Sequence, residues 1–596
     1  MISSWPSVWP GALIFCLTLT IFTSSKVRQI TDSNYSMVAS QGLLEHGTFS
    51  LEHYKLPAEA PLNRGYYISD GLQYQLELVN GHILYHLPPG SSVLSVPFVT
   101  LMKAFGISPT NPDGTYNPPG EAKIQYTLAA ILMAALAALF YYTARLVLPR
   151  YWSALVALGG ALGTQVLSTA SRAMWSDTWG IVLLGIVVWL LFAREMGRRR
   201  LNPIVLASLL AWLYFIRPTY AVHILAVTVY VFIFYRHHFI KCAVTGASWF
   251  ITFVAFSLHY HGRLLPSYYQ ANRINFGFFW TALAGNLISP ARGLLVYVPV
   301  LFFVAYLLAR YWQDVISRRL VLLSLAVTVI HLIAISGFSH WWGGHSFGAR
   351  FSTGLVPWFV LLSILGLRAM LTWRERERKS TWSIAWKGQL IAGGALLLVS
   401  VFINARGAMS HQTWLWNTRP KEIDRYPERL WDWREPQFLA GWVPRPLSHA
   451  YPLTWERIDF AKPEVENFIW YGWSGPDEQS TWTDGNRATF VFSLDPVTDL
   501  TLQFKLGPFL VPGKHDEQRV LVSANGRQID ALTLRENVAK VYQIVLPKAA
   551  LRQTNVLEFS LPDAVSPSSL GVNEDVRKLG IAVYWMKFQP TASPGT

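Results

Sequence analysis

Long apolar stretches recur along the first two thirds of the chain and are separated by polar loops. A bilayer core about 30 Å thick requires about 20 apolar helical residues for each crossing. The shorter apolar segment 92–105 contains Pro97, and we expect it to lie along the membrane interface. The longer stretches predict about eleven transmembrane helices, near residues 6–24, 124–147, 152–171, 177–193, 202–216, 219–235, 239–258, 292–310, 319–337, 351–371 and 387–404.

The overall composition agrees with this membrane pattern. Apolar residues make up 52% of the 596 positions, charged residues make up 14%, and the mean hydropathy is +0.27. These values exclude an ordinary soluble protein and predict a polytopic α-helical membrane protein. Both cysteines, Cys16 and Cys242, lie in apolar stretches, so we expect neither a disulfide framework nor a thiolate metal site.

The charge of the loops predicts their orientation. Lys and Arg cluster in every second loop, at residues 145–150, 194–200, 236–241, 310–319 and 374–379. Such loops stay on the cytoplasmic side, so the net charge of +15 indicates orientation rather than nucleic-acid binding. The long loop 25–120 and everything after Asn404 then lie outside. We therefore expect a multi-pass protein of the plasma (inner) membrane, with an uncleaved N-terminal anchor and an extracytoplasmic active site and C-terminal domain.

The pattern changes beyond Asn404, where the long apolar stretches stop. Residues 405–464 are expected to be an extracytoplasmic linker, and Ala524-Asn525-Gly526 predicts a tight hairpin. Several short strands with polar turns favour a β-sandwich over residues 465–596. The expected strands are 487–494, 500–506, 519–523, 541–546, 556–561 and 580–588.

Three tryptophans of this C-terminal region leave two interpretations open. Trp470, Trp473 and Trp482 lie close together along the chain. Exposed aromatic rings stack on sugars, which would make the domain carbohydrate-binding, whereas buried ones would fill the core.

Two acidic residues are the candidates for chemistry at the membrane edge. Asp32 directly follows the first apolar stretch, and Asp177 follows the third. A carboxylate beside the bilayer is costly to desolvate unless it is paired, so its presence suggests a function. Each acid has a structural alternative, because either one could cap a helix that starts beside it.

Cationic side chains are expected on the same external face. The planar fork of arginine matches phosphate oxygens, so some of these residues suit an anionic head group, while others only snorkel. The loop 339–350 combines cations with Gly343 and Gly344, which let the backbone approach a ligand closely. The external cations are Arg172, Arg217, Arg263, Arg273, Arg292, His340, His345 and Arg350.

Other signatures narrow the source of any activated substrate. The sequence has no Cys/His spacing typical of a metal site and no glycine-rich nucleotide loop. The cytoplasmic loops are too short to form a domain that binds a nucleotide sugar. Any activated donor must therefore be presented from the membrane.

Four motifs in this order carry a family resemblance. They are the Asp32 loop, Gly81 to Gly90 leading into Pro97, Ser289 to Leu294, and Trp341 to Gly344 with Gly348 to Phe351. From Asp32 to about Asn404 the chain resembles bacterial GT-C fold membrane glycosyltransferases. These enzymes use a polyprenyl-phosphate-linked sugar and are similar to the protein mannosyltransferase and aminoarabinose transferase superfamily.

The resemblance implies roles for individual residues. Asp32 would be the general base that deprotonates the acceptor hydroxyl, and Asp177 a second catalytic acid, although some members of the family have histidine there. Candidates for binding substrate, the lipid phosphate above all, are Tyr85, His86, Arg217, Arg292, His340, His345 and Arg350.

The implied partners are a polyprenyl-phosphate-linked sugar donor, a glycan, lipid or protein acceptor, and membrane lipids, with no nucleic acid. No cofactor is certain, and the sequence leaves open whether a divalent metal assists. The nearest alternative is an oligosaccharide ligase or polymerase that uses a polyprenyl-diphosphate-linked glycan. A transporter of lipid-linked sugars is the alternative from another class, but the charges lie at the loop edges and the two halves of the chain do not repeat.

Overall fold

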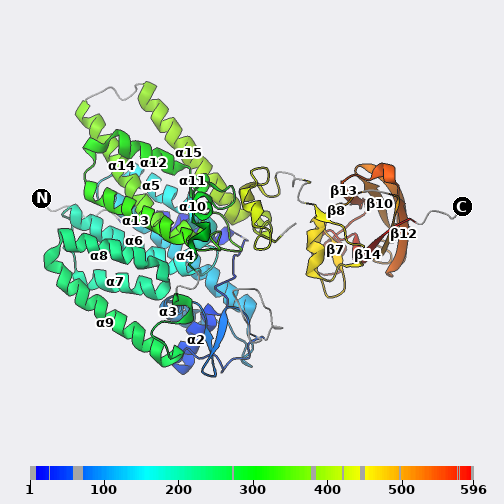
Figure 1. The fold of residues 1–596 in the computed structure, drawn as a ribbon, viewed down its shortest axis with the longest axis horizontal. Helices are drawn as coiled ribbons and strands as arrows, with labels where there is room; N and C mark the ends of the chain where they lie inside the picture. Colours follow the sequence, from blue (N-terminus) through cyan, green and yellow to red (C-terminus); the bar gives the residue numbers. More distant parts are fainter. Residues whose placement is uncertain are drawn as a thin grey trace. The chain divides into compact units, whose positions relative to one another are not determined.

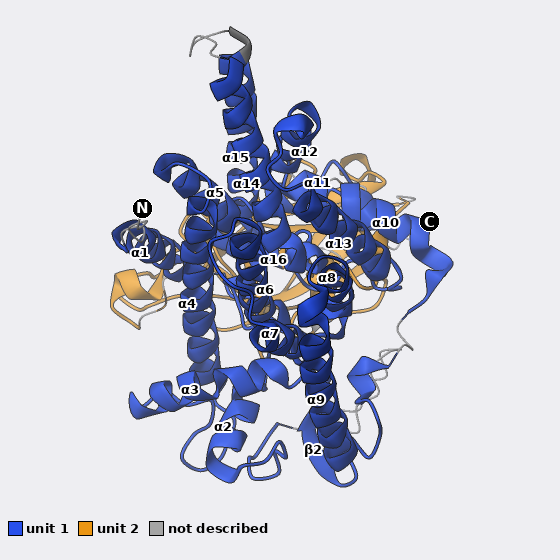
Figure 2. Ribbon diagram, turned by 90° about the vertical axis from the view of Figure 1, so that its left-hand side faces the viewer, with its two compact units in different colours: residues 1–414, 428–440 blue, residues 415–427, 441–596 orange. Residues whose placement is uncertain are grey.

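The chain divides into two compact units. In the computed structural model, the first unit comprises residues 1–414 and 428–440, and the second comprises 415–427 and 441–596 (Figure 2). Residues 428–440, inside the expected linker 405–464, thus belong to the first unit, while the predicted domain boundaries stay a prediction. The structure describes residues 8–25, 27–57, 72–270, 274–377, 384–418, 422–442, 447, 450–495, 498–573, 575 and 577–591, so Arg273 lies outside the described residues.

The first unit is a bundle of helices (Figure 1). Among the described residues, six helices are long and apolar enough to cross a membrane: α4 (Pro118–Arg145), α6 (Ser176–Glu195), α9 (Arg236–His261), α13 (Arg318–Ser336), α14 (Val356–Glu377) and α15 (Ile384–Met409). Shorter apolar helices accompany them: α1 (Trp9–Ser24), α7 (Pro203–Ile216), α8 (Ala221–Phe234), α10 (Phe279–Ile288) and α12 (Val300–Arg310). These findings agree with a membrane protein, and the total of about eleven crossings stays a prediction.

Helix α4 shows how the sequence forms and places such an element. Its first residue is Pro118, and the side chain of Asn117 accepts a hydrogen bond from the Gly120 N–H at 3.2 Å. Both features favour a helix start. Small residues such as Ala130 and Ala137 are fully buried along α4, which packs against α1, α6 and α5 (Arg150–Leu162). Small side chains let membrane helices approach closely.

The long first loop contains regular structure of its own. Helices α2 (Ser36–His46) and α3 (Gly90–Ala104) both pack against α4. Strands β1 (Leu76–Val79) and β2 (His82–Tyr85) belong to the same loop, and Figure 2 shows β2 near one end of α9. The two strands form an antiparallel hairpin in which Leu76 pairs with Tyr85. Its turn residues Asn80 and Gly81 have positive φ angles of 52° and 85°, as a tight hairpin turn requires. This hairpin was not predicted.

The second unit contains two six-stranded sheets. One has the order β11-β10-β13-β8-β3 with β5 also paired to β8, and the other has β12-β9-β14-β7-β6 with β4 also paired to β14. Side chains from both sheets join one hydrophobic cluster. The strands are β3 (Tyr451–Pro452), β4 (Ile458–Asp459), β5 (Ile469–Tyr471), β6 (Trp473–Pro476), β7 (Thr481–Thr483), β8 (Arg487–Ser493), β9 (Leu500–Pro508), β10 (Gln518–Ala524), β11 (Arg527–Leu534), β12 (Lys540–Leu546), β13 (Thr554–Ser560) and β14 (Ile581–Pro590).

The structure confirms the main strand predictions for this unit. All six expected strands are present, and Asn525 and Gly526 form the hairpin turn between β10 and β11 with φ angles of 52° and 84°. Trp473 is only 8% exposed, donates to the Thr489 carbonyl at 2.9 Å and packs on Phe460, so it is a core residue. The description as a β-sandwich stays a prediction.

Candidate functional site

Asp32 and Arg350 form an ion pair that joins the 25–120 loop to the 339–350 loop. The Asp32 side chain is 31% exposed, whereas Arg350 is only 8% exposed. The Tyr74 hydroxyl donates to Oδ1 of Asp32 at 3.1 Å, and the guanidinium carbon of Arg350 lies 3.7 Å from the centre of the Trp175 ring. The carboxylate is therefore held on one side and open to solvent on another.

These partners set the acidity of Asp32. Burial by itself raises the pKa of the carboxyl, but the charge and hydrogen bond of Arg350 and the hydrogen bond from Tyr74 act in the opposite direction. The net result is a pKa below the usual range for aspartate. Arg350 thus keeps Asp32 ionised. If Arg350 moved away from the carboxylate, the pKa of Asp32 would rise and Asp32 would become a stronger base.

The backbone around Asp32 is anchored by polar side chains from other elements. Tyr85 donates its hydroxyl to the Asp32 carbonyl at 2.9 Å, and Gln75 donates to the Thr31 carbonyl at 2.9 Å. Burial raises the pKa of Tyr85 well above its usual value, so this hydroxyl keeps its proton and can donate. The two anchors belong to the β1–β2 hairpin and the residue before it.

Helix α4 supplies a second set of anchors. The Glu121 carboxylate accepts from the backbone N–H groups of Tyr35 and Met37, both at 3.0 Å. The N-terminus of α2 has no side-chain cap, and Tyr35 there has a φ of 68°. The alternative that Asp32 caps this helix is therefore wrong: Glu121 binds the helix N-terminus, and Asp32 is left to pair with Arg350.

Gln125, one turn further along α4, connects the two acid-bearing loops. Its amide nitrogen donates to the Ser33 carbonyl at 2.8 Å, and its amide oxygen accepts from the Met174 N–H at 3.2 Å. Ser33 follows Asp32, and Met174 precedes Trp175 and Asp177. One side chain thus fixes the position of both loops.

Asp177 forms a second acid–arginine pair, with Arg217. It lies in the first turn of α6, where no side-chain cap is formed, and Tyr220 also donates to it at 3.3 Å. Both partners are buried, at 6% exposure for Asp177 and 8% for Arg217. The ring centre of Phe351 lies 5.2 Å from the Arg217 guanidinium and 5.9 Å from that of Arg350, so this ring separates the two arginines.

The 339–350 loop presents backbone carbonyls to arginines. Arg350 donates to the Gly343 carbonyl at 3.0 Å, while Arg292 donates to those of Trp342 and Gly344 at 2.9 and 3.2 Å. Gly343 and Gly344 have φ angles of 70° and 62°, which favour glycine. Arg292 also donates to Gln437 at 2.5 Å. Arg292 therefore holds the loop, and its predicted contact with phosphate stays a prediction.

His86 belongs to a separate polar group around Glu77. His86 lies 3.2 Å from one Glu77 carboxylate oxygen, Ser267 donates to the same oxygen at 2.5 Å, and His261 lies 3.5 Å from the other. Burial by itself raises the pKa of Glu77, but the hydrogen bonds and charges of its partners, His86 above all, lower it by a larger amount. The pKa of this carboxyl is therefore below its usual value. These interactions join the hairpin to the end of α9.

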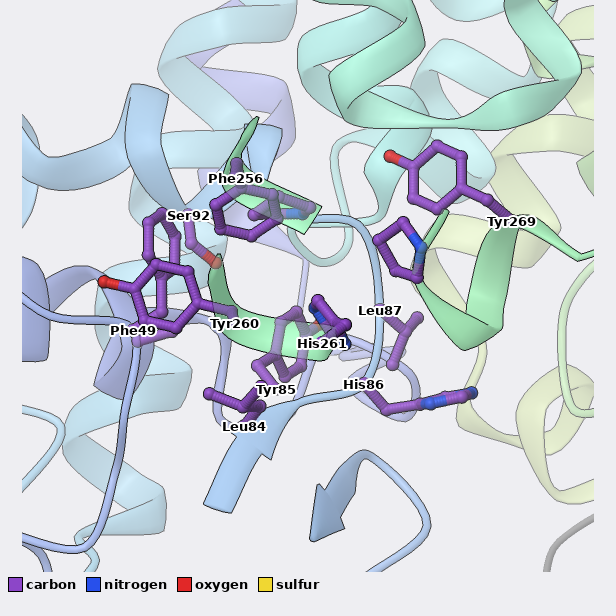
Figure 3. Close-up of a pocket in the computed structure, with 13 residues that line it drawn as sticks. Phe49, Leu84, Tyr85, His86, Leu87, Ser92, Phe256, Tyr260, His261 and Tyr269 are labelled. Carbon is purple, nitrogen blue, oxygen red and sulfur yellow. The ribbon is translucent and has the colours of Figure 1, made fainter. Parts of the chain in front are cut away.

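An aromatic pocket adjoins this group. Figure 3 shows Tyr85, His86 and His261 at its wall with Phe49, Phe256, Tyr260 and Tyr269 around them. The Tyr85 ring lines the pocket while its hydroxyl contacts the backbone of Asp32. The Tyr85 side chain therefore connects the pocket to the Asp32 turn.

The structure thus brings together only part of the predicted set. Asp32 contacts both Arg350 and Tyr85. Asp177 pairs with Arg217, and the Phe351 ring lies near the guanidinium groups of both arginines. His340 stacks on Trp342 at 4.1 Å within the 339–350 loop. The predicted substrate-binding roles of His340 and His345 stay predictions.

Sequence reasoning missed several residues that shape the site. Tyr74, Trp175, Glu77, Glu121 and Gln125 were not singled out. A signal existed for Trp175, which stands two positions before Asp177, and for the hairpin residues, because Asn80-Gly81 is a turn motif. Nothing in the local pattern distinguishes Gln125 from other polar residues near a helix start.

The arrangement suits an anionic ligand more than a metal cation. Both carboxylates face a guanidinium, so the positive charge a cation would bring is already supplied by arginine. Arg350 adds a planar fork next to a half-open carboxylate. A hydroxyl that reaches Asp32 and a phosphate that reaches Arg350 would lie side by side.

Comparisons with known proteins give little guidance. No protein-family model matches the chain, and no curated protein matches it. Among solved structures, the arabinosyltransferase EmbB from Mycobacterium smegmatis aligns with a TM-score of 0.36 and 10% identity over 99% of this chain and 66% of that one. A family GH115 4-O-methyl-α-glucuronidase with specificity for decorated arabinogalactans aligns with a TM-score of 0.17 and 15% identity, over 34% of this chain and 30% of that one. These similarities establish neither a fold nor an activity for this chain.

Proposed function

We propose that this protein is a membrane glycosyltransferase of the GT-C type, with Asp32 as the general base. It moves a sugar from a polyprenyl-phosphate donor to a hydroxyl of a glycan, lipid or protein acceptor on the extracytoplasmic face. The observation that carries the proposal is the ion pair between the partly exposed Asp32 side chain and the buried Arg350. A base for the acceptor and a cation for the leaving phosphate are the two groups that this reaction needs.

In the proposed reaction the acceptor oxygen attacks the anomeric carbon of the donor. Its proton passes to Asp32, the bond from the anomeric carbon to the phosphate oxygen breaks, and polyprenyl phosphate leaves with the electron pair. Arg350 stabilises the negative charge that gathers on this phosphate. A single displacement of this kind inverts the anomeric centre and forms no covalent intermediate with the enzyme.

The Asp32–Arg350 pair also couples donor binding to the base. A donor phosphate competes with Asp32 for the guanidinium, whose position stays defined by Trp175 and the Gly343 carbonyl. Once Arg350 faces the phosphate, the burial of Asp32 is no longer offset, and its basicity rises. We therefore propose that the donor activates the base, so that the carboxylate is least reactive in the empty enzyme.

The second pair has a supporting role in this proposal. Asp177 and Arg217 are both buried and face each other, whereas Arg350 faces the partly exposed Asp32. The charge of Arg217 also acts on Asp32 and helps to keep it ionised. Asp177 then serves to hold Arg217 beside the site rather than to exchange a proton with the acceptor.

A donor panel tests the proposal. The purified protein, reconstituted in nanodiscs with a lipid-extract acceptor mixture, would receive one radiolabelled sugar as polyprenyl phosphate, as polyprenyl diphosphate or as a nucleotide sugar. Label transferred from the monophosphate alone supports the proposal. Transfer from the diphosphate alone would identify the ligase or polymerase alternative, and transfer from the nucleotide sugar would overturn the proposed donor class.

A further inference from the structure

The second unit has an open cleft formed by the end of one strand and the turn that precedes another. Tyr471, the last residue of β5, lines it together with Asp484, Gly485, Asn486 and Arg487, which form the turn between β7 and β8 and the start of β8. The cleft has a volume of about 430 Å³. This volume lies within the range of small-molecule sites, about 300–1,000 Å³.

The cleft combines an exposed aromatic ring with planar polar groups. Tyr471 is 67% exposed, although it follows two less exposed residues in the same strand. An exposed tyrosine ring offers a rigid apolar face on which a ligand ring can stack, with a hydroxyl beside it for hydrogen bonding. Beside it, Asp484 and Asn486 supply side-chain oxygens and an amide, and Arg487 supplies guanidinium donors.

The backbone holds these groups in place. The Asp484 N–H donates to the Gly472 carbonyl, and the Gly485 N–H donates to the Lys578 carbonyl, both at 2.8 Å. Gly472 has a φ of 73°, and a Cβ there would lie 1.8 Å from the Arg487 carbonyl oxygen, so only glycine permits this approach. The backbone of the turn and of the tyrosine is therefore fixed before any ligand arrives, which lowers the entropy cost of binding.

The hydrogen-bonding capacity of the cleft is only partly used. Asp484 accepts from the Lys578 N–H through Oδ1 at 3.1 Å, and within the described part of the chain its Oδ2 has no hydrogen bond. Arg487 pairs with Glu558 through Nε at 2.8 Å and is 60% exposed. The charges of Asp484 and Arg487 oppose each other, and Glu558 offsets Arg487 further. The cleft therefore has no excess positive charge to select an anion.

From this geometry we propose that the cleft binds a neutral saccharide. The CH face of a pyranose or furanose ring stacks on Tyr471, and its hydroxyls hydrogen-bond to Asp484, Asn486 and Arg487. None of the three tryptophans considered from the sequence lines this cleft, and Trp473 is a core residue. The proposal goes beyond the proposed transferase activity and does not depend on it, because the ligand is bound by the second unit and no bond is broken there.

Binding to the full-length protein tests this site. The protein would be held in nanodiscs, since maltoside and glucoside detergents carry competing sugar rings. Neutral oligosaccharides of glucose, mannose, galactose, xylose and arabinose would be titrated by calorimetry, with uronic-acid oligosaccharides and a neutral hydrophilic peptide in parallel. At least one neutral saccharide should bind. Binding of the uronic acids or the peptide alone, or of no probe, would overturn the proposal.

Variants locate the binding to this cleft. Tyr471→Ala should lower the affinity by about tenfold or more, whereas Tyr471→Phe keeps the ring and should stay within about threefold. Trp455→Ala removes another half-exposed aromatic ring of the same unit and should change nothing. Equal affinity for Tyr471→Ala and the unmodified protein would contradict the site. Saccharide binding is measured without any sugar donor and located by Tyr471→Ala, whereas the transferase proposal is tested by the donor panel, so the two proposals can fail independently.

Discussion

The two acid–arginine pairs of the first unit have the same chemistry but different surroundings. Asp177 and Arg217 are both nearly inaccessible, whereas Asp32 keeps 31% of its side chain exposed opposite a buried Arg350. A fully buried pair is expensive to break, because the remaining charge has no solvent to replace its partner. A half-open pair can exchange one partner for a ligand. In the proposed function, exposure is therefore what distinguishes the structural pair from the reactive one.

The largest expected effect follows removal of the open carboxylate. Asp32→Asn keeps the size of the side chain but cannot accept a proton, so transfer should fall by about 10²–10⁴-fold. Turnover of the polyprenyl-phosphate sugar in nanodiscs measures this. Asp113→Asn makes the same chemical change at an exposed aspartate of the same loop and should keep full activity. Normal turnover by Asp32→Asn would exclude its role as base.

Breaking the buried pair should affect stability more than chemistry. Asp177→Asn leaves the Arg217 charge buried and unpaired, which costs about 3–5 kcal/mol of unfolding free energy. Thermal unfolding followed by size-exclusion chromatography should show a clear loss, and Asp32→Asn a smaller one. The double change Asp177→Asn with Arg217→Gln should recover part of the stability. A double variant no more stable than the single one would contradict this account.

Removing the arginine that pairs with Asp32 should weaken donor binding selectively. Arg350→Met keeps packing on Trp175 but loses the charged hydrogen bonds, so the KM for the donor should rise by about 10- to 100-fold. The KM for the acceptor should change little, and Arg350→Lys should lie in between. Initial rates over a grid of donor and acceptor concentrations measure both constants. Parallel losses for donor and acceptor would argue against a phosphate role.

The pH dependence of activity tests whether Arg350 controls the pKa of Asp32. Because Arg350 lowers the pKa of Asp32, the carboxylate stays ionised to a pH below about 4, the usual pKa of an aspartate. Any stability that the ion pair contributes is therefore lost only as the pH falls through the lowered pKa. In Arg350→Met the burial that raises the pKa is unopposed, so the acid limb of kcat/KM should move to higher pH. An unchanged limb would show that another group controls it.

The smallest effect concerns the residue that aligns the two pairs. Gln125→Leu removes the hydrogen bonds to Ser33 and Met174, so kcat should fall by about fivefold to tenfold with little change in the KM of the donor. Thr127→Val, which loses only a bond within α4, serves as the control. If Gln125→Leu lowered thermal stability but left kcat unchanged, Gln125 would have only a packing role.

Most of the long helices and strands could be predicted from the sequence. The apolar stretches marked the long helices, and the period-two alternation of the C-terminal region marked six strands, because each pattern follows directly from which face an element buries. Strand β11 was missed since Arg527–Leu534 is mostly exposed and carries little apolar alternation. The hairpin before Tyr85 was missed because its two strands are only four residues long, although Asn80-Gly81 indicated a turn.

The partnerships within the site were decided by the tertiary structure alone. The sequence by itself determined a membrane-type helical region, a β-rich region and an acid at the boundary of the first helix. It contained two alternatives for Asp32, and only the fold excluded the helix cap, by bringing Glu121 to the helix N-terminus and Arg350 to the Asp32 carboxylate. Arg350 lies 318 positions further along the chain. Local patterns report which surface an element buries, whereas a contact over such a separation depends on how all the intervening helices pack.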